Sequence, residues 1–164
     1  MKILRTVVIL ALFLSAMAFS GCGDENKNAN SATLLSNGSL ENANSAKTNV
    51  EELGLQVNIP YEPEDIVWKE AANHKQIIAV LRFSAEDANK IVAEAAPRQA
   101  PQNVKLSSDS WFPAELIAQS EMSGDDSLNG LAYAADSFYQ EPYTSGRIMR
   151  IEGTDYFVLE LSAK

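Results

Sequence analysis

Histidine and paired carboxylates are the side chains of this chain that could carry acid–base chemistry. His74 is the only histidine, so a Ser-His-Asp arrangement would have to assemble around it in three dimensions. It lies between Asn73 and Lys75 with no nucleophile motif nearby, which favours a solvated turn residue. Of the 22 acidic residues, 19 fall in residues 51–164, so a carboxylate pair suited to glycoside hydrolysis arises by number alone. We therefore expect no enzyme, with a carboxylate-dependent cell-envelope hydrolase as an alternative.

Metal and cofactor sites have little support in the sequence. Asp125, Asp126 and Asn129 could offer oxygens to calcium, but they lack the spacing of an EF-hand loop. One Cys and one His exclude a disulfide framework and a cysteine-based zinc finger. Neither of the glycine-rich nucleotide motifs occurs, so we expect no metal and no cofactor.

The candidate binding segment is residues 138–147, FYQEPYTSGR. It contains Tyr139, Tyr143 and Arg147, and tyrosine and arginine are enriched at the energetic centres of protein interfaces. The alternative is a connection between strands whose tyrosines pack over the sheet edge. By the same reasoning, Trp111 and Phe112 are predicted as core anchors at the start of a helix rather than as a ligand platform.

The acidic balance limits the possible partners. The chain has 13 Lys+Arg against 22 Asp+Glu, a net charge of -9, which argues against nucleic-acid binding because phosphates require a basic surface. Residues 51–164 alone carry 9 basic and 19 acidic residues, or -10. Such a charge would steer a cationic partner, so a basic envelope protein is the predicted partner. A small-molecule-binding protein with a cup formed by sheet and helices remains an alternative.

The N-terminus has the layout of an export signal. Lys2 and Arg5 precede residues 6–19, which are almost entirely apolar, and the small residues Ser20 and Gly21 follow. This apolar core of about 14 residues is shorter than the 20 or so that a membrane-spanning helix needs. The only cysteine of the chain, Cys22, comes directly afterwards.

This arrangement resembles a bacterial lipoprotein signal peptide, whose lipobox ends in the cysteine that accepts lipid. Phe19 stands where the family usually has leucine or another aliphatic residue. The resemblance implies that residues 1–21 are removed, that Cys22 becomes a multiply acylated N-terminus, and that Gly23 directs the protein to the outer membrane. Stable anchoring requires more than one acyl chain, which such a cysteine supplies. The mature chain would carry 11 basic and 22 acidic residues, or -11.

Residues 22–50 are predicted to form the lipidated cysteine and a disordered tether. They are rich in Asn, Ser and Ala, and the string NANSA occurs twice, at residues 28–32 and 42–46. So few apolar residues cannot offset the entropy of ordering the segment. The tether would let the following domain stand clear of the membrane surface.

Residues 51–164 are predicted to form a single α+β domain. Residues 66–71 and 76–83 indicate a β-hairpin, followed by a helix capped by Ser84 and ended by Pro97. A loop, a short helix from Pro113 to about Met122, a strand over residues 131–140 and a hairpin of residues 147–151 and 156–161 complete the pattern. The order ββααβββ predicts an antiparallel sheet of about five strands with two helices on one face.

Overall fold

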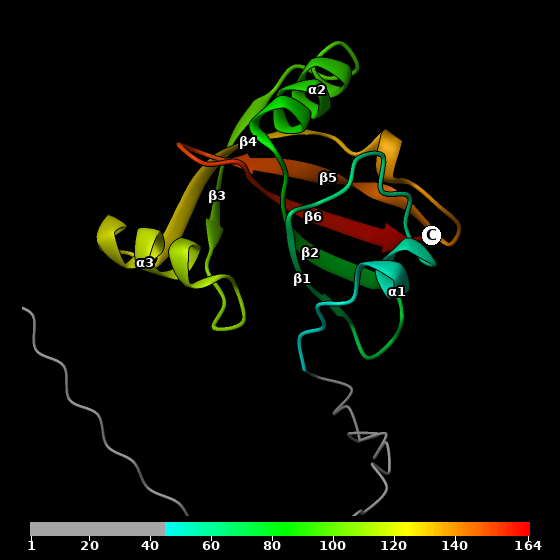
Figure 1. Cartoon of the computed structure of the whole chain (residues 1–164), viewed down its shortest axis with the longest axis horizontal. Helices are drawn as coiled ribbons and strands as arrows, with labels where there is room; N and C mark the ends of the chain where they lie inside the picture. Colours follow the sequence, from blue (N-terminus) through cyan, green and yellow to red (C-terminus); the bar gives the residue numbers. More distant parts are fainter. Residues whose placement is uncertain (1–44) are drawn as a thin grey trace, which may run out of the picture. The chain divides into compact units, whose positions relative to one another are not determined.

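The computed structural model describes residues 45–164; the predicted signal peptide, Cys22 and most of the predicted tether lie outside the described residues. The described chain has an α+β fold (Figure 1). Its elements, in order, are α1 (Val50–Gly54), β1 (Asp65–Glu70), β2 (Gln76–Arg82), α2 (Ala85–Ala95), β3 (Gln102–Ser107), α3 (Ala114–Ser123), β4 (Ser127–Ala134), the 3-10 helix η1 (Asp136–Phe138), β5 (Tyr143–Ile151) and β6 (Tyr156–Ala163).

The six strands form one antiparallel sheet in the order β1-β2-β6-β5-β4-β3. β1 and β2 form a hairpin, and so do β5 and β6, as the sequence predicted. The last strand, β6, pairs with β5 of its own hairpin and with β2 of the first hairpin, so it lies inside the sheet, whereas β1 and β3 are the edges.

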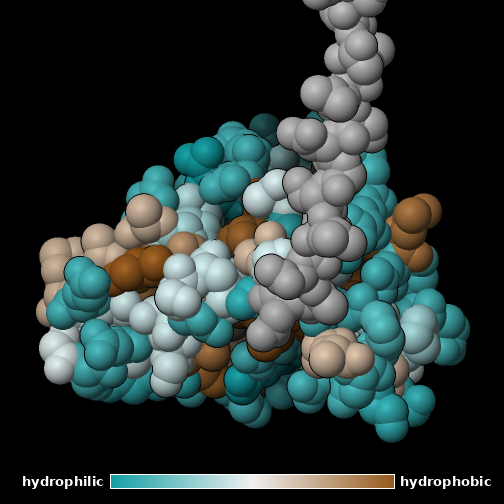
Figure 2. All heavy atoms as spheres, turned by 90° about the horizontal axis from the view of Figure 1, so that it is seen from below, coloured by the Kyte–Doolittle hydropathy of each residue, from teal (hydrophilic) through white to brown (hydrophobic). Residues whose placement is uncertain are grey.

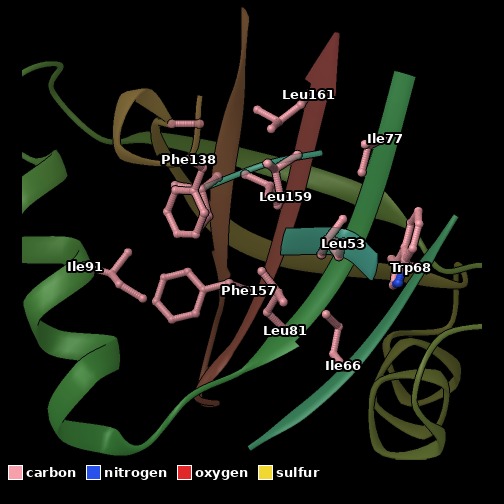
Figure 3. Packing of buried hydrophobic residues seen from close by; sticks show 14 of the residues in the cluster. Leu53, Ile66, Trp68, Ile77, Leu81, Ile91, Phe138, Phe157, Leu159 and Leu161 are labelled. Carbon is pink, nitrogen blue, oxygen red and sulfur yellow. The ribbon is translucent and has the colours of Figure 1, made fainter. Parts of the chain in front are cut away.

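The sheet buries side chains on both faces. Phe157, Leu159 and Leu161 of β6 belong to one apolar cluster, which also contains Leu53 of α1 and Ile91 of α2; we call this side the α2 face. Figure 3 shows Ile91 pointing toward the ring of Phe157. The alternate β6 residues Tyr156 and Val158 belong to a second cluster with Leu116 of α3, which we call the α3 face. Neighbouring strand residues point to opposite faces, so β6 is apolar along most of its length.

Local capping explains where the helices begin and end. The Ser84 side chain accepts a hydrogen bond from the backbone N–H of Asp87 at 3.1 Å, which satisfies a free donor in the first turn of α2, as predicted. Asn49 does the same for α1 through the N–H of Glu52 at 3.0 Å. Helix α3 ends at Gly124, whose φ of 80° is the left-handed conformation that glycine adopts readily.

The structure corrects the predicted architecture in detail. The sheet has six strands rather than about five, and the described chain has three α-helices rather than two. Prediction missed α1 and β3, and the helices pack on both faces of the sheet rather than on one. The strand expected at residues 131–140 is Ser127–Ala134, because the chain turns into η1 and buries Phe138 there.

Residues that precede the predicted domain boundary at residue 51 contact the sheet. Lys47 pairs with Trp68 of β1 through two backbone hydrogen bonds of 2.8 Å, and the Trp68 indole Nε1 donates to the carbonyl of Asn49 at 3.1 Å. The residues between Lys47 and α1 are thus held against the edge of the sheet.

The surface is mainly hydrophilic on the side seen in Figure 2, with separate apolar spots. Four large apolar side chains of the described chain are exposed: Leu55, Ile78, Met122 and Leu131. Within residues 45–164 every helix is too short or too polar to cross a membrane.

Candidate binding groove

A groove of about 770 Å³ lies over the β3–β4–β5 end of the sheet. The turn between β5 and β6 forms one wall of it, and Leu131, an exposed apolar residue, lies among its lining residues. We call this site the groove and define it by its lining residues: Asn103, Val104, Lys105, Asn129, Gly130, Leu131, Arg150, Ile151, Glu152, Gly153, Thr154 and Asp155.

Strand register brings these side chains together from three segments. Asn103 of β3 pairs with Leu131 of β4, and Leu131 pairs with Arg150 of β5, so these three form a row across the sheet. Lys105 and Asn129 are paired in the neighbouring row. Alternation along each strand places both rows on the α2 face.

Arg150 is the most firmly held polar group of the groove. Its Nε donates to the carbonyl of Thr154 at 3.2 Å, and its two terminal nitrogens donate to Asn89 Oδ1 at 3.0 Å and Asp155 Oδ1 at 2.7 Å. Its guanidinium carbon lies 5.9 Å from the centre of the Phe157 ring. These contacts use three of the five N–H groups of the guanidinium and fix its plane. Because Asn89 belongs to α2, Arg150 also joins that helix to the β5–β6 turn.

The second cation of the groove, Lys105, is paired with Asp125. Asp125 also accepts hydrogen bonds from the hydroxyls of Ser127 at 2.5 Å and Ser123 at 2.8 Å. The ammonium of Lys105, and then these two hydroxyls, hold the pKa of the Asp125 carboxyl well below its ordinary value of 3.8. Asp125 is one of the residues that could offer oxygens to calcium, and its carboxylate is already bound by these three side chains. Residues 45–164 contain no group of three or more His, Cys, Asp or Glu side chains that could hold a metal ion.

The groove therefore combines an apolar floor with balanced polar walls. Its two cations, Lys105 and Arg150, are each ion-paired, and Glu152 and Asp155 supply carboxylates at the wall. Asn103 and Asn129 add amide donors and acceptors. This chemistry suits the reversible binding of a molecule with polar groups and an apolar face.

The three residues predicted for binding do not form one surface. Tyr143 is only 1% exposed and belongs to the cluster of the α2 face, so its side chain is not open to a partner in this structure. The half-buried Tyr139 packs against the cluster of the α2 face, and its hydroxyl donates to the carbonyl of Gly146 at 3.1 Å. Arg147 alternates with Ile148 of that cluster, so it lies on the α3 face, where it pairs with Glu160 at 2.6 Å. The alternative, that the tyrosines pack over the sheet, agrees with these positions.

The aromatic pair at the start of α3 behaves as predicted. Phe112 is 6% exposed and lies in the cluster of the α3 face, against which the half-buried Trp111 packs. The two rings meet edge to face with their centres 4.8 Å apart. They are part of the core, as expected.

His74 is placed by the turn between β1 and β2, where its φ is 52°. Its Nδ1 lies 2.8 Å from Glu70 Oε1, and its side chain is 78% exposed. Burial raises the pKa of the Glu70 carboxyl, but hydrogen bonds from Tyr143 and His74 outweigh burial and leave that pKa below its ordinary value of 4.5. A lowered pKa is the opposite of what a general acid needs.

Sequence reasoning missed most of the groove because β3 was expected to be a loop. Val104 and Leu106 alternate with polar residues there, and this period of two was the available signal for a strand. Arg150 lay within a predicted strand, but its partners come from α2 and from the β5–β6 turn. Comparison with protein-family models, with curated proteins and with solved structures finds no match to this chain.

Proposed function

We propose that this protein is a lipid-anchored, non-enzymatic binding protein of the bacterial cell envelope, and that its α+β domain holds a ligand in the groove. The observation that carries the binding role is the groove itself. Its volume of about 770 Å³ falls within the range of about 300 to 1,000 Å³ that is typical of small-molecule sites. This favours the small-molecule alternative over a purely protein-binding role.

The composition of the groove supports a ligand with both polar and apolar parts. Leu131 is 39% exposed on the floor, and a bound molecule would cover it. Arg150 is already held by Asn89, Thr154 and Asp155, so little side-chain entropy is lost when its remaining N–H groups meet a ligand.

Attachment to the membrane rests on the N-terminal sequence. Acylation of Cys22 after removal of residues 1–21 would hold the mature chain on the membrane. By the resemblance to lipoprotein signal peptides, Gly23 favours the outer membrane. Replacing Cys22 with Ser should release the protein into the soluble fraction of the envelope. A Cys22→Ser variant that stays in the membrane fraction would contradict lipidation, and the native protein found in inner membranes would contradict the sorting.

The hydrolase alternative predicts a buried carboxylate with a raised pKa. The buried polar residues of the described chain are Ser120 and Ser127, so no carboxylate is fully buried there. The part-buried Glu70 has a lowered pKa, and it is not a lining residue of the groove. No observation on residues 45–164 therefore favours hydrolysis.

Binding in the groove can be tested with a fragment library and the mature chain carrying Cys22→Ser. Amide chemical shifts recorded by NMR should change at Asn103, Leu131 and Thr154 when fragments bind. Leu131→Trp fills the floor and should abolish these changes. Leu55→Trp, at a residue that is 79% exposed and does not line the groove, is the matched control and should leave them intact. Fragment binding that persists in Leu131→Trp would refute the assignment.

A further inference from the structure

The two edges of the sheet differ in whether they are covered. The edge of β1 is closed at Trp68, whose backbone N–H and C=O both bond to Lys47 at 2.8 Å. At the other edge, the backbone groups of β3 form no hydrogen bond within residues 45–164 other than those to β4. β3 therefore offers a row of free N–H and C=O groups to an extended chain.

Half-buried apolar side chains line the edge on the α3 face. Val104 and Leu106 of β3 pack against the cluster that contains Leu128 and Leu116, but they are only half-buried. A strand added beside β3 would place every second side chain next to them, because paired strands share the same alternation. Such contacts would cover the remaining apolar surface of both residues.

On the α2 face, the same edge borders the groove. Asn103 and Lys105 alternate with Val104 and Leu106 and line the groove from the side of β3. The other half of the side chains of an added strand would therefore stand next to polar groups. The edge favours a segment in which apolar and polar residues alternate.

Charge selects among the possible occupants. Residues 51–164 have a net charge of -10, so a second copy of the domain would be repelled and a cationic segment attracted. Near the C-terminal end of β3, Asp109 and Asp126 are exposed carboxylates without an ion pair in the described chain, whereas Lys105 is paired with Asp125. This end of the edge therefore also carries negative charge.

We propose that β3 binds an extended segment of a partner protein that is net cationic and alternates apolar with polar residues, as a seventh strand of the sheet. The segment pairs with the backbone of β3, covers Val104 and Leu106, and is attracted by the acidic domain. β1 lies five strand spacings from β3, roughly 24 Å at about 4.8 Å each. The partner and the segment leading from the lipid anchor therefore occupy opposite edges.

Fluorescent, end-blocked octapeptides of alternating valine and lysine can serve as the probe, with fluorescence anisotropy as the readout and the mature Cys22→Ser chain as the receptor. A valine–glutamate octapeptide tests the charge, and a valine–lysine octapeptide with a central proline tests strand pairing. We expect the first peptide to bind at least about tenfold more tightly than the other two, and more weakly at high salt. Hydrogen exchange should slow at amides of β3.

The variant Val104→Lys places a charge on the apolar side of the edge and should weaken binding by about tenfold or more. Ile78→Lys makes the same change of charge at an exposed residue of β2 and should change the affinity by less than about twofold. Both variants must first give the circular dichroism and melting temperature of the unmodified chain. Leu106→Lys replaces Val104→Lys if the latter does not fold.

Several outcomes would overturn the proposal. The proposal fails if the valine–lysine peptide does not bind at millimolar concentration, or if the glutamate or proline peptide binds equally well. It also fails if protection from hydrogen exchange appears outside β3, or if Val104→Lys leaves the affinity unchanged. A dimer that Val104→Lys dissociates would assign the edge to a second copy instead. Because Val104 also lines the groove, Leu106→Lys, at a residue that does not line it, repeats the test of the edge. Filling the groove with Leu131→Trp tests the ligand site separately, so the two proposals can fail independently.

Discussion

The hydroxyl of Tyr143 donates a hydrogen bond to Glu70 Oε1 at 2.7 Å, although the two residues are 73 positions apart in the chain. It also lies 3.1 Å from the carbonyl oxygen of His74. Burial, followed by the hydrogen bond to Glu70, raises the pKa of Tyr143, so the phenol keeps its proton and remains a donor. This contact joins the start of β5 to the β1–β2 turn.

Removing that hydroxyl should destabilise the domain. Tyr143→Phe leaves the part-buried Glu70 carboxylate with one donor fewer, and a hydrogen bond to a charged group contributes about 1.5 to 3 kcal/mol. Tyr139→Phe is the control, since its hydroxyl bonds to a neutral carbonyl and should cost about 1 kcal/mol or less. Urea unfolding of both variants measures the difference. Equal losses of unfolding free energy in the two variants would show that the bond to Glu70 contributes no more than a bond to a neutral carbonyl.

Stability should fall in acid partly through Glu70. Its folded-state pKa lies below the ordinary value of 4.5, so its contribution is present above that value and is lost as the pH falls through the folded pKa. The free energy of unfolding should therefore decrease below about pH 4.5, and the decrease should be smaller in Glu70→Gln. Unfolding by urea at stepped pH values from neutral to about pH 3 measures both slopes.

The exposed residue Glu62 supplies the control for this experiment. Glu62→Gln removes a carboxylate for which no ion pair is found in the described chain, and it should leave the acid slope unchanged. Asp87 and Asp125 also have lowered pKa values and contribute to the loss of stability in acid. The test therefore compares how steeply the free energy of unfolding falls with pH in each variant, not the total loss of stability. Identical slopes in Glu70→Gln and the unmodified chain would contradict the assignment.

Gly146 should not tolerate a side chain. Its φ is 146°, and a Cβ atom there would collide with the carbonyl oxygen of Glu160 and with Leu161. Because the obstacle is backbone of the paired strand, Gly146→Ala should cost more than about 2 kcal/mol. Gly54→Ala has no neighbour within 4 Å and should be neutral or slightly stabilising. Thermal unfolding compares the two, and similar melting temperatures would refute the clash.

The elements that were predicted correctly are those whose ends are set by residues next to them in the sequence. Asn73 and His74 separate two runs that favour strands, and the β1–β2 hairpin turns there. Ser84 and Pro97 bracket α2, which runs from Ala85 to Ala95. In each case the breaking or capping residue acts on its immediate neighbours, so its effect does not depend on the rest of the fold.

The elements that were missed depend on distant contacts. β3 lies at the edge of the sheet and is mostly polar, so its sequence alone gives only a weak strand signal. Its backbone hydrogen bonds to β4 hold it in the extended conformation. α1 has five residues, too few for a helix to form alone, and is held by the burial of Leu53. The groove depends on the same pairing, since Asn103, Leu131 and Arg150 meet only through the strand register.

The segment before β1 should prove to be part of the domain. Leu53 is fully buried, and the backbone of Lys47 and Asn49 satisfies the N–H, the C=O and the indole of Trp68. A chain beginning at residue 45 keeps these contacts, whereas one beginning at residue 55 loses them and leaves a cavity at Leu53. The shorter chain should therefore be less stable by about 2 to 5 kcal/mol, the usual cost of deleting a buried leucine.

Denaturant unfolding followed by tryptophan fluorescence can measure this loss, because Trp68 lies directly under the deleted contacts. Leu53→Ala in the longer chain separates the cavity from the lost hydrogen bonds: it should account for most of the loss but not all of it. If the chains starting at residues 45 and 55 unfold at the same denaturant concentration, the segment is only a linker and the domain begins after it. If the shorter chain is less stable, the segment belongs to the domain, and the predicted tether joins the domain at the β1 edge, opposite β3 and the groove.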